Sequence, residues 1–177
     1  MRLLRRSGVS GKRQRIDAPV VIIIILKKNV PPPGSVQKYL NKVSGPLLDR
    51  IDLHVEVTPV AFSELTGQQQ GETSAVIRER VIKARSIQAE LYQSTPGLYA
   101  NAQMSSKQLH EICIIDHVGE TLLKKAMERL NLSARAYDRI LKVSRTIADL
   151  ATSGDIKPEH LAEAIHYRSL DREGWAG

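Results

Sequence analysis

A single stretch of alternating residues limits how this chain can fold. Residues 51–58 alternate apolar with polar side chains and stop at Pro59, and the apolar face holds Ile51, Leu53, Val55 and Val57. A period of two residues predicts a half-buried β-strand, and a strand needs partners in a sheet. From Thr73 onward, however, the apolar spacing is that of helices. We therefore expect the back end of a larger α/β domain, followed by a helical domain.

Five helices are expected after residue 72, from their caps and their apolar spacing. They run from Thr73 to about Gln93, from Ser105 or Ser106 to Cys113, from Asp116 through an apolar stripe at 122–130, from Ser133 to Ala151, and from Pro158 to about Ser169. The first helix is expected to place one side against the core, namely Ile77, Val81, Ala84, Gln88 and Leu91. Short helical turns are expected at 35–41 and 46–50.

The N-terminal segment differs in charge from the rest. The 177 residues carry a formal net charge of +7, and residues 1–30 hold eight basic residues and one acidic residue. The remainder has 18 of each sign, so it lacks the excess positive charge that is typical of a nucleic-acid-binding domain. We therefore treat 1–33 as a segment apart from the body.

This segment also contains an unbroken apolar run, residues 20–26. The run is much shorter than the roughly 20 residues of a membrane-spanning helix, and its β-branched residues favour a short strand. The prolines at 31–33 then interrupt the chain. No signal-peptide pattern is present, so a cytoplasmic location without a membrane partner is the expectation.

A basic cluster on the helix at 133–151 is the first candidate site. Arg135, Arg139 and Lys142 lie opposite its apolar side, with Arg145 at their edge. Such a cluster is usually a solvated basic face. It can also be an anion site, because Arg135 lies in the first turn, where the helix dipole favours a phosphate.

Arg50 is the second candidate. It lies between a one-turn helix and the strand, beside Asp49 and Asp52. One interpretation is a local ion pair of small energy. The other is an arginine presented at the rim of a site.

The residues around these arginines resemble a known family. Residues 38–53 read KYLNKVSGPLLDRIDL, residues 101–104 read NAQM, and residues 132–143 read LSARAYDRILKV. In this order they resemble the magnesium-chelatase-like AAA+ ATPases, and within them the YifB/ComM competence group. The resemblance runs from about Gly34 to Leu170. It implies a mostly α fold: the terminal strand and turns of an AAA+ α/β core at 34–60, a linker at 61–71, an all-α helical lid at 72–170 and a tail at 171–177.

The resemblance also implies functional roles. Arg50 matches the arginine finger, which reaches the γ-phosphate held by a neighbouring subunit and stabilises charge during hydrolysis. Arg135 matches the sensor-2 arginine of the lid, which contacts nucleotide on its own subunit, and Arg139 is a further candidate for that contact. Complete members are implied to use ATP and Mg²⁺, to form hexameric rings and, in the ComM type, to move on branched DNA during transformation.

The sequence departs from the family in its first part. It contains no G-x-x-x-x-G-K-[ST] phosphate loop, and no acidic run after an apolar strand offers a Mg²⁺ ligand. The N-terminal segment 1–33, which we call the basic arm, occupies the place of the family's sensor-1 segment. We interpret it as a frameshifted, misassembled or mis-started reading of the gene. We expect this chain alone to bind and hydrolyse no ATP.

Two other functions are compatible with the residues. A stand-alone helical module could bind nucleic acid through Arg135, Arg139, Lys142 and the basic arm, and a magnesium-chelatase-type subunit acting on porphyrin has support from fold alone. No metal site is expected, because neither His110 nor His117 has a convincing third ligand. Cys113 is expected to be a buried thiol, His54 a residue on the polar face of the strand, and His160 and His166 surface residues.

Overall fold

The computed structural model describes residues 21–25, 50–57 and 71–168, which form two strands and five α-helices. The predicted mostly helical fold, with a strand before the helical region, is confirmed. The elements in chain order are β1 (Val21–Ile25), β2 (Leu53–Val57), α4 (Ser74–Leu91), the 3₁₀ turn η1 (Asn101–Gln103), α5 (Ser106–Ile112), α6 (His117–Arg129), α7 (Ala134–Leu150) and α8 (Pro158–His166). The turn expected at 35–41, most of the one at 46–50, and the tail 171–177 lie outside the described residues.

The helices begin where their caps predict. The side-chain oxygens of Thr73, Ser105, Asp116 and Ser133 each accept a hydrogen bond from a backbone N–H in the first turn, and the tightest is 2.7 Å, from Gly119 to Asp116 Oδ1. These bonds satisfy donors that a helix start leaves without a partner. Pro158 occupies the first position of α8, where its missing N–H costs nothing.

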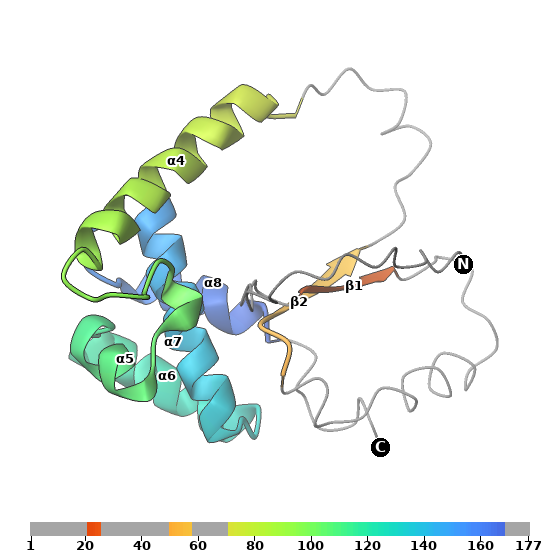
Figure 1. The fold of residues 1–177 in the computed structure, drawn as a ribbon. Coiled ribbons are helices and arrows are strands. Elements are labelled where there is room, and N and C mark those ends of the chain that lie inside the picture. The colour runs from red at the N-terminus through yellow and green to blue at the C-terminus, as the bar shows by residue number, and fades with distance from the viewer. Residues whose placement is uncertain (1–20, 26–49, 58–70, 169–177) are drawn as a thin grey trace, which may run out of the picture.

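The predicted strand has a partner from a distant part of the chain. β1 and β2 pair in parallel, with Val21 opposite Leu53 and Ile25 opposite Val57 (Figure 1). We expected this chain to supply little of the sheet that residues 51–58 need, and the described residues supply one neighbouring strand. The apolar run at 20–26 forms a strand, as its β-branched residues favour, although it lies in the segment that we had set apart.

His54 departs from the simple alternation of β2. It was expected on the polar face, but its side chain is 2% exposed. The His54 backbone also contacts a distant part of the chain, because its N–H donates to the carbonyl of Tyr167 at 2.8 Å. The residues after α8 therefore lie against the edge of β2 at this position, and His54 is buried although the sequence pattern assigned its side to solvent.

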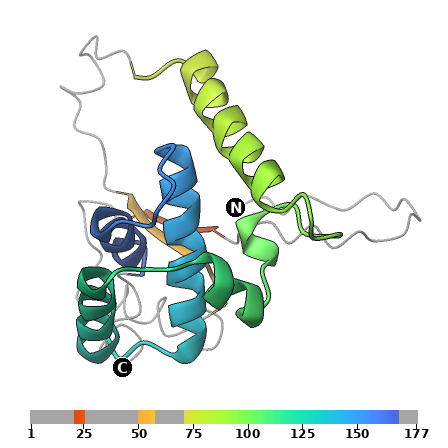
Figure 2. The same ribbon diagram turned by 90° about the vertical axis from the view of Figure 1, so that its left-hand side faces the viewer.

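α7 is the central helix of the helical region. It packs against α4, α5, α8 and η1, and Figure 2 shows it standing between α8 and α6 on one side and α4 and α5 on the other. Its residues Ile140, Leu141 and Ala148 are at most 1% exposed. They join a core that also includes Leu98, Met104, Leu109, Leu123, Ile156 and Leu161.

α4 buries less of its apolar side than expected. Ala84 and Gln88 are buried, whereas Ile77, Val81 and Leu91 are each more than 40% exposed. The N-terminal half of α4 extends beyond the helices that it packs against (Figures 1 and 2). Helical spacing therefore identified the correct side of α4 but not how much of it is covered.

A buried carboxylate joins four parts of the helical region. Asp149 is 0% exposed. Its Oδ2 accepts hydrogen bonds from Gln88 of α4 at 3.0 Å and from Asn101 of η1 at 2.7 Å, and its Oδ1 pairs with Arg145 Nε at 2.8 Å. Arg145 also donates to the carbonyls of residues 153 and 154, just after α7. A buried charge is tolerated when it is paired and hydrogen-bonded in this way.

Two further sequence expectations concern single side chains. Cys113 is a buried thiol, as predicted, and His166 is exposed. His160 was expected at the surface but is buried, because its Nδ1 accepts a hydrogen bond from the Lys157 N–H and so closes the first turn of α8. No helix within the described ranges has the length and apolar character needed to cross a membrane.

Replacing Asp149 by alanine is expected to destabilise the helical region by about 3 to 5 kcal/mol, because the variant leaves the buried Arg145 charge and two amide donors without their acceptor. Urea unfolding followed by circular dichroism measures this change. Asp155→Ala, which removes an exposed carboxylate a few residues away, is the matched control. Equal stability of the two variants would contradict the role given to Asp149.

Burial raises the pKa of the Cys113 thiol to about 12. The reactive thiolate is then scarce at pH 8, so we expect a disulfide reagent to modify the folded chain about 100-fold more slowly than the chain unfolded in guanidinium. The absorbance of the released thiolate measures both rates, and similar rates would show that the thiol is accessible.

Candidate functional site

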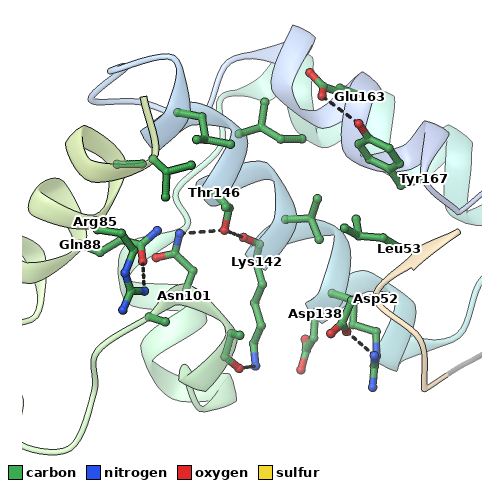
Figure 3. A pocket seen from close by; sticks show the side chains of 18 of the residues that line it. Asp52, Leu53, Arg85, Gln88, Asn101, Asp138, Lys142, Thr146, Glu163 and Tyr167 are labelled. Carbon is green, nitrogen blue, oxygen red and sulfur yellow. Dashed lines mark hydrogen bonds and ion pairs between the residues drawn. The ribbon is translucent and has the colours of Figure 1, made fainter. Parts of the chain in front are cut away.

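A cavity of about 760 Å³ lies where β2 meets the helical region. Its walls come from the start of β2, the middle and C-terminal part of α4, η1, one side of α7 and the end of α8. Figure 3 shows this arrangement, with Asp52 and Leu53 on one side and Arg85, Gln88 and Asn101 on the other. Segments that are far apart in the sequence therefore contribute to one site.

The cavity contains three of the four arginines that the sequence singled out. Arg50, Arg135 and Arg139 line it together with two further cations, Arg85 and Lys142. Three carboxylates, those of Asp52, Asp138 and Glu163, also line it. Positive charge is therefore in excess, which favours an anionic ligand. Arg85 and Glu163 could not be predicted from the sequence, because only the packing of α4 and α8 on α7 brings them to this place.

The remaining wall of the cavity is apolar. Leu53 of β2, Val81 of α4 and three residues of α7 line it, namely Val143, Ile147 and Leu150. A mostly apolar cavity with a few charged groups is the usual composition of a ligand site. The charges determine where the anionic part of a ligand can lie.

Arg135 is an exposed side chain in the first turn of α7. Ser133 caps this helix, with its Oγ accepting from the Ala136 N–H at 3.1 Å. The N-terminus of α7 contributes partial positive charge beside the guanidinium. The position predicted from spacing is therefore confirmed, and the contact with a phosphate stays a prediction.

Arg50 is an exposed turn residue three positions before β2. Its backbone is fixed to α7, because its carbonyl accepts a hydrogen bond from Arg139 Nη1 at 2.5 Å. The same nitrogen pairs with Asp52 Oδ1. Asp52, which the sequence offered as a local partner for Arg50, thus pairs with a residue of the lid.

The basic side of α7 is not a solvated face. Arg139 is 23% exposed at its side chain and is bonded to residues 50 and 52. Lys142 donates to the carbonyl of Ala102 at 3.2 Å, and Arg145 is buried with Asp149. These cations hold neighbouring elements in place. The interpretation of this cluster as a solvated basic face is therefore wrong for three of its four residues, namely Arg139, Lys142 and Arg145.

No group of three or more histidine, cysteine or carboxylate side chains that could hold a metal ion occurs within the described part of the chain.

Comparison with known proteins shows which families and relatives this chain resembles. Residues 71–168 match the family described as magnesium chelatase, subunit ChlI C-terminal, and residues 26–65 match magnesium chelatase, subunit ChlI. The competence protein ComM of Haemophilus influenzae is 46% identical over 142 residues, which cover 79% of this chain and 27% of that protein. The YifB proteins of Salmonella typhimurium and Escherichia coli are 35% and 34% identical, and each match covers 93% of this chain and 34% of the relative. The chain thus spans about a third or less of the length of these relatives.

The excess of cations predicts that the cavity binds a polyphosphate weakly, which revises our expectation that this chain alone binds no ATP. We expect 10 mM tripolyphosphate to stabilise the chain by about 1.4 kcal/mol, as linkage gives for a dissociation constant near 1 mM. Arg135→Ala should remove more than half of this effect, and Lys83→Ala, on an exposed part of α4 outside the cavity, should leave it unchanged. Thermal unfolding with and without the ligand measures it. An equal shift in both variants would mean that the anion binds elsewhere.

Proposed function

This chain belongs to the magnesium chelatase ChlI family, and from that premise we propose that it supplies the arginine finger and the sensor-2 lid of a magnesium-chelatase-like AAA+ ATPase. The observation that carries the proposal is the shared cavity, which is lined by both Arg50 and Arg135. The resemblance implies that these ATPases form rings with one nucleotide between neighbouring subunits. A cationic wall on one subunit can then complete the nucleotide site of the next subunit.

In this proposal Arg50 is the catalytic residue. Its side chain stabilises the negative charge that develops on the transferred phosphoryl group, as an arginine supplied in trans does in other nucleotide hydrolases. Arg50 lines the cavity three positions before β2. A guanidinium suits this role because it stays charged and presents several donors in a fixed plane.

Arg135 is the proposed sensor-2 arginine. The resemblance implied that it acts on nucleotide bound to its own subunit, whereas the finger acts on that of a neighbour. Both arginines line one cavity of this chain. This geometry supports a form of the proposal in which Arg135 and Arg50 contact the same nucleotide rather than nucleotides of different subunits. The apolar wall at Val143 and Ile147 is then available to less polar parts of the ligand.

The described residues fit the phosphates of ATP but not its magnesium ion. Five cations line the cavity, and no cluster of metal-ligating side chains occurs in the described ranges. The sequence contains no phosphate-loop motif. ATP and Mg²⁺ are therefore proposed to be held by the region of the AAA+ core that carries this motif, and the present residues act on the phosphates from outside.

We further propose a homo-oligomeric ring that acts on DNA, with six subunits as the resemblance implies. The resemblance to the competence group implies this partner, and the Haemophilus influenzae relative is named a competence protein. The alternative of a stand-alone nucleic-acid-binding module loses support, because Arg139 and Lys142 are bonded to other parts of the chain. A role on porphyrin is supported by the name of the family, but no described residue of the cavity supports it.

A mixing experiment tests the proposal. The chain is combined with a full-length relative that has an intact phosphate loop but whose own finger arginine is replaced by alanine. We expect the mixture to hydrolyse ATP, and Arg50→Ala in the present chain to lower kcat by about 10³-fold or more. Arg50→Lys should recover little of the loss. Lys83→Ala serves as the control for a lost surface charge. Full turnover with Arg50→Ala would contradict the assignment of the finger.

A further inference from the structure

The backbone that carries Arg50 is held by the helical region through four contacts. Arg139 donates to the Arg50 carbonyl at 2.5 Å and pairs with Asp52. Arg168, just after α8, donates to the Ile51 carbonyl. The His54 N–H donates to the carbonyl of Tyr167 at 2.8 Å. These contacts span about 90 to 120 positions of the sequence, so they join the strand directly to the lid.

Part of the same segment is buried. Ile51 and Arg168 are each 1% exposed, and His54 is 2% exposed, whereas the side chains of Arg139 and Asp52 are 23% and 25% exposed. Hydrogen bonds from a charged donor are stronger than neutral ones, and burial keeps water from replacing those made at Ile51 and His54. Residues 50–54 are therefore attached to the lid more firmly than a loop at a domain boundary usually is.

We propose that Arg139 and Arg168 form a clamp that fixes the Arg50 backbone to the lid, and that Arg139 is a positioning residue for the arginine finger. The part concerning catalysis rests on the proposed function of Arg50. Arg135 lies one helical turn before Arg139 on the same side of α7. The clamp thus keeps Arg50 and Arg135 at a constant separation across the cavity when the lid moves.

The geometry separates this role from that of a phosphate ligand. Arg139 Nη1 already contacts two acceptors, the Arg50 carbonyl and the Asp52 carboxylate. A ligand role would make its loss weaken nucleotide binding and raise KM. A positioning role would misplace Arg50 in the transition state, which lowers kcat and leaves KM unchanged.

Amide hydrogen exchange of the chain alone tests the clamp. In Arg139→Ala we expect the amides of residues 51–54 to exchange at least about fivefold faster than in the unaltered chain, because fewer contacts hold the segment. Asp52→Ala should act in the same direction. Lys142→Ala, which removes a cation from the same side of α7 but contacts Ala102, should leave this exchange unchanged. Melting curves verify that all three variants fold. Unchanged exchange in Arg139→Ala would overturn the clamp.

The mixing assay tests the positioning role. Arg139→Ala and Asp52→Ala should each lower kcat about tenfold or more with KM within about twofold of its original value. The double variant should lose little more than Arg139→Ala alone, since both act through one contact. A raised KM in Arg139→Ala with normal kcat in Asp52→Ala would instead identify Arg139 as a ligand and overturn the proposal.

The exchange experiment and the mixing assay can contradict the clamp and the proposed function separately. If the mixture containing the unaltered chain shows no turnover, the proposed function is wrong, and the exchange experiment still decides whether the clamp exists. If exchange is faster in Arg139→Ala while kcat is unchanged, the clamp exists but positions no catalytic group, and the positioning role is overturned.

Discussion

The buried carboxylate of Asp149 is the interaction on which the helical region depends. It binds Gln88 of α4, Asn101 of η1 and Arg145 of α7, and Arg145 in turn holds the turn after α7. Because a buried charge must be paired, these elements can occupy only the arrangement that satisfies it. Hydrophobic burial favours many packings of the same helices, whereas this network selects one. The walls of the cavity are built from the same elements, so the network also sets the shape of the site.

α7 connects the core to the site. One side of it carries Ile140, Leu141 and Ala148 into the core, and the other presents Arg135 and Arg139 to the cavity. The two sides follow from the helical period. Any shift of α7 that repacked the core would therefore move both arginines, together with the strand bonded to Arg139. Stability and the proposed chemistry are properties of the same helix, and its central position leaves little freedom to change one alone.

The local elements could be predicted because their causes are local. Thr73, Asp116 and Ser133 cap helices through bonds to residues three positions away, so a short window of sequence contains the whole interaction. The prediction was wrong where a distant segment decides the outcome. His54 is bonded to Tyr167, more than 100 positions away, and Arg145 is paired with Asp149, whose other partners are Gln88 and Asn101 from 61 and 48 positions away. The strand lacked a partner in our prediction because β1 lies nearly 30 residues earlier, beyond a run of prolines.

By itself, the sequence determined the helices, their starts, the buried thiol of Cys113, the family, and the identity of Arg50 and Arg135 as candidates. Periodicity, capping and motif spacing are properties of neighbouring residues, so they can be recognised without knowledge of the fold. Only the tertiary structure decided that these two arginines line one cavity, that Arg139 bonds the backbone of Arg50, and that Asp149 joins four segments. These are contacts between residues about 50 to 90 positions apart, and their energy depends on burial, which a linear pattern does not specify.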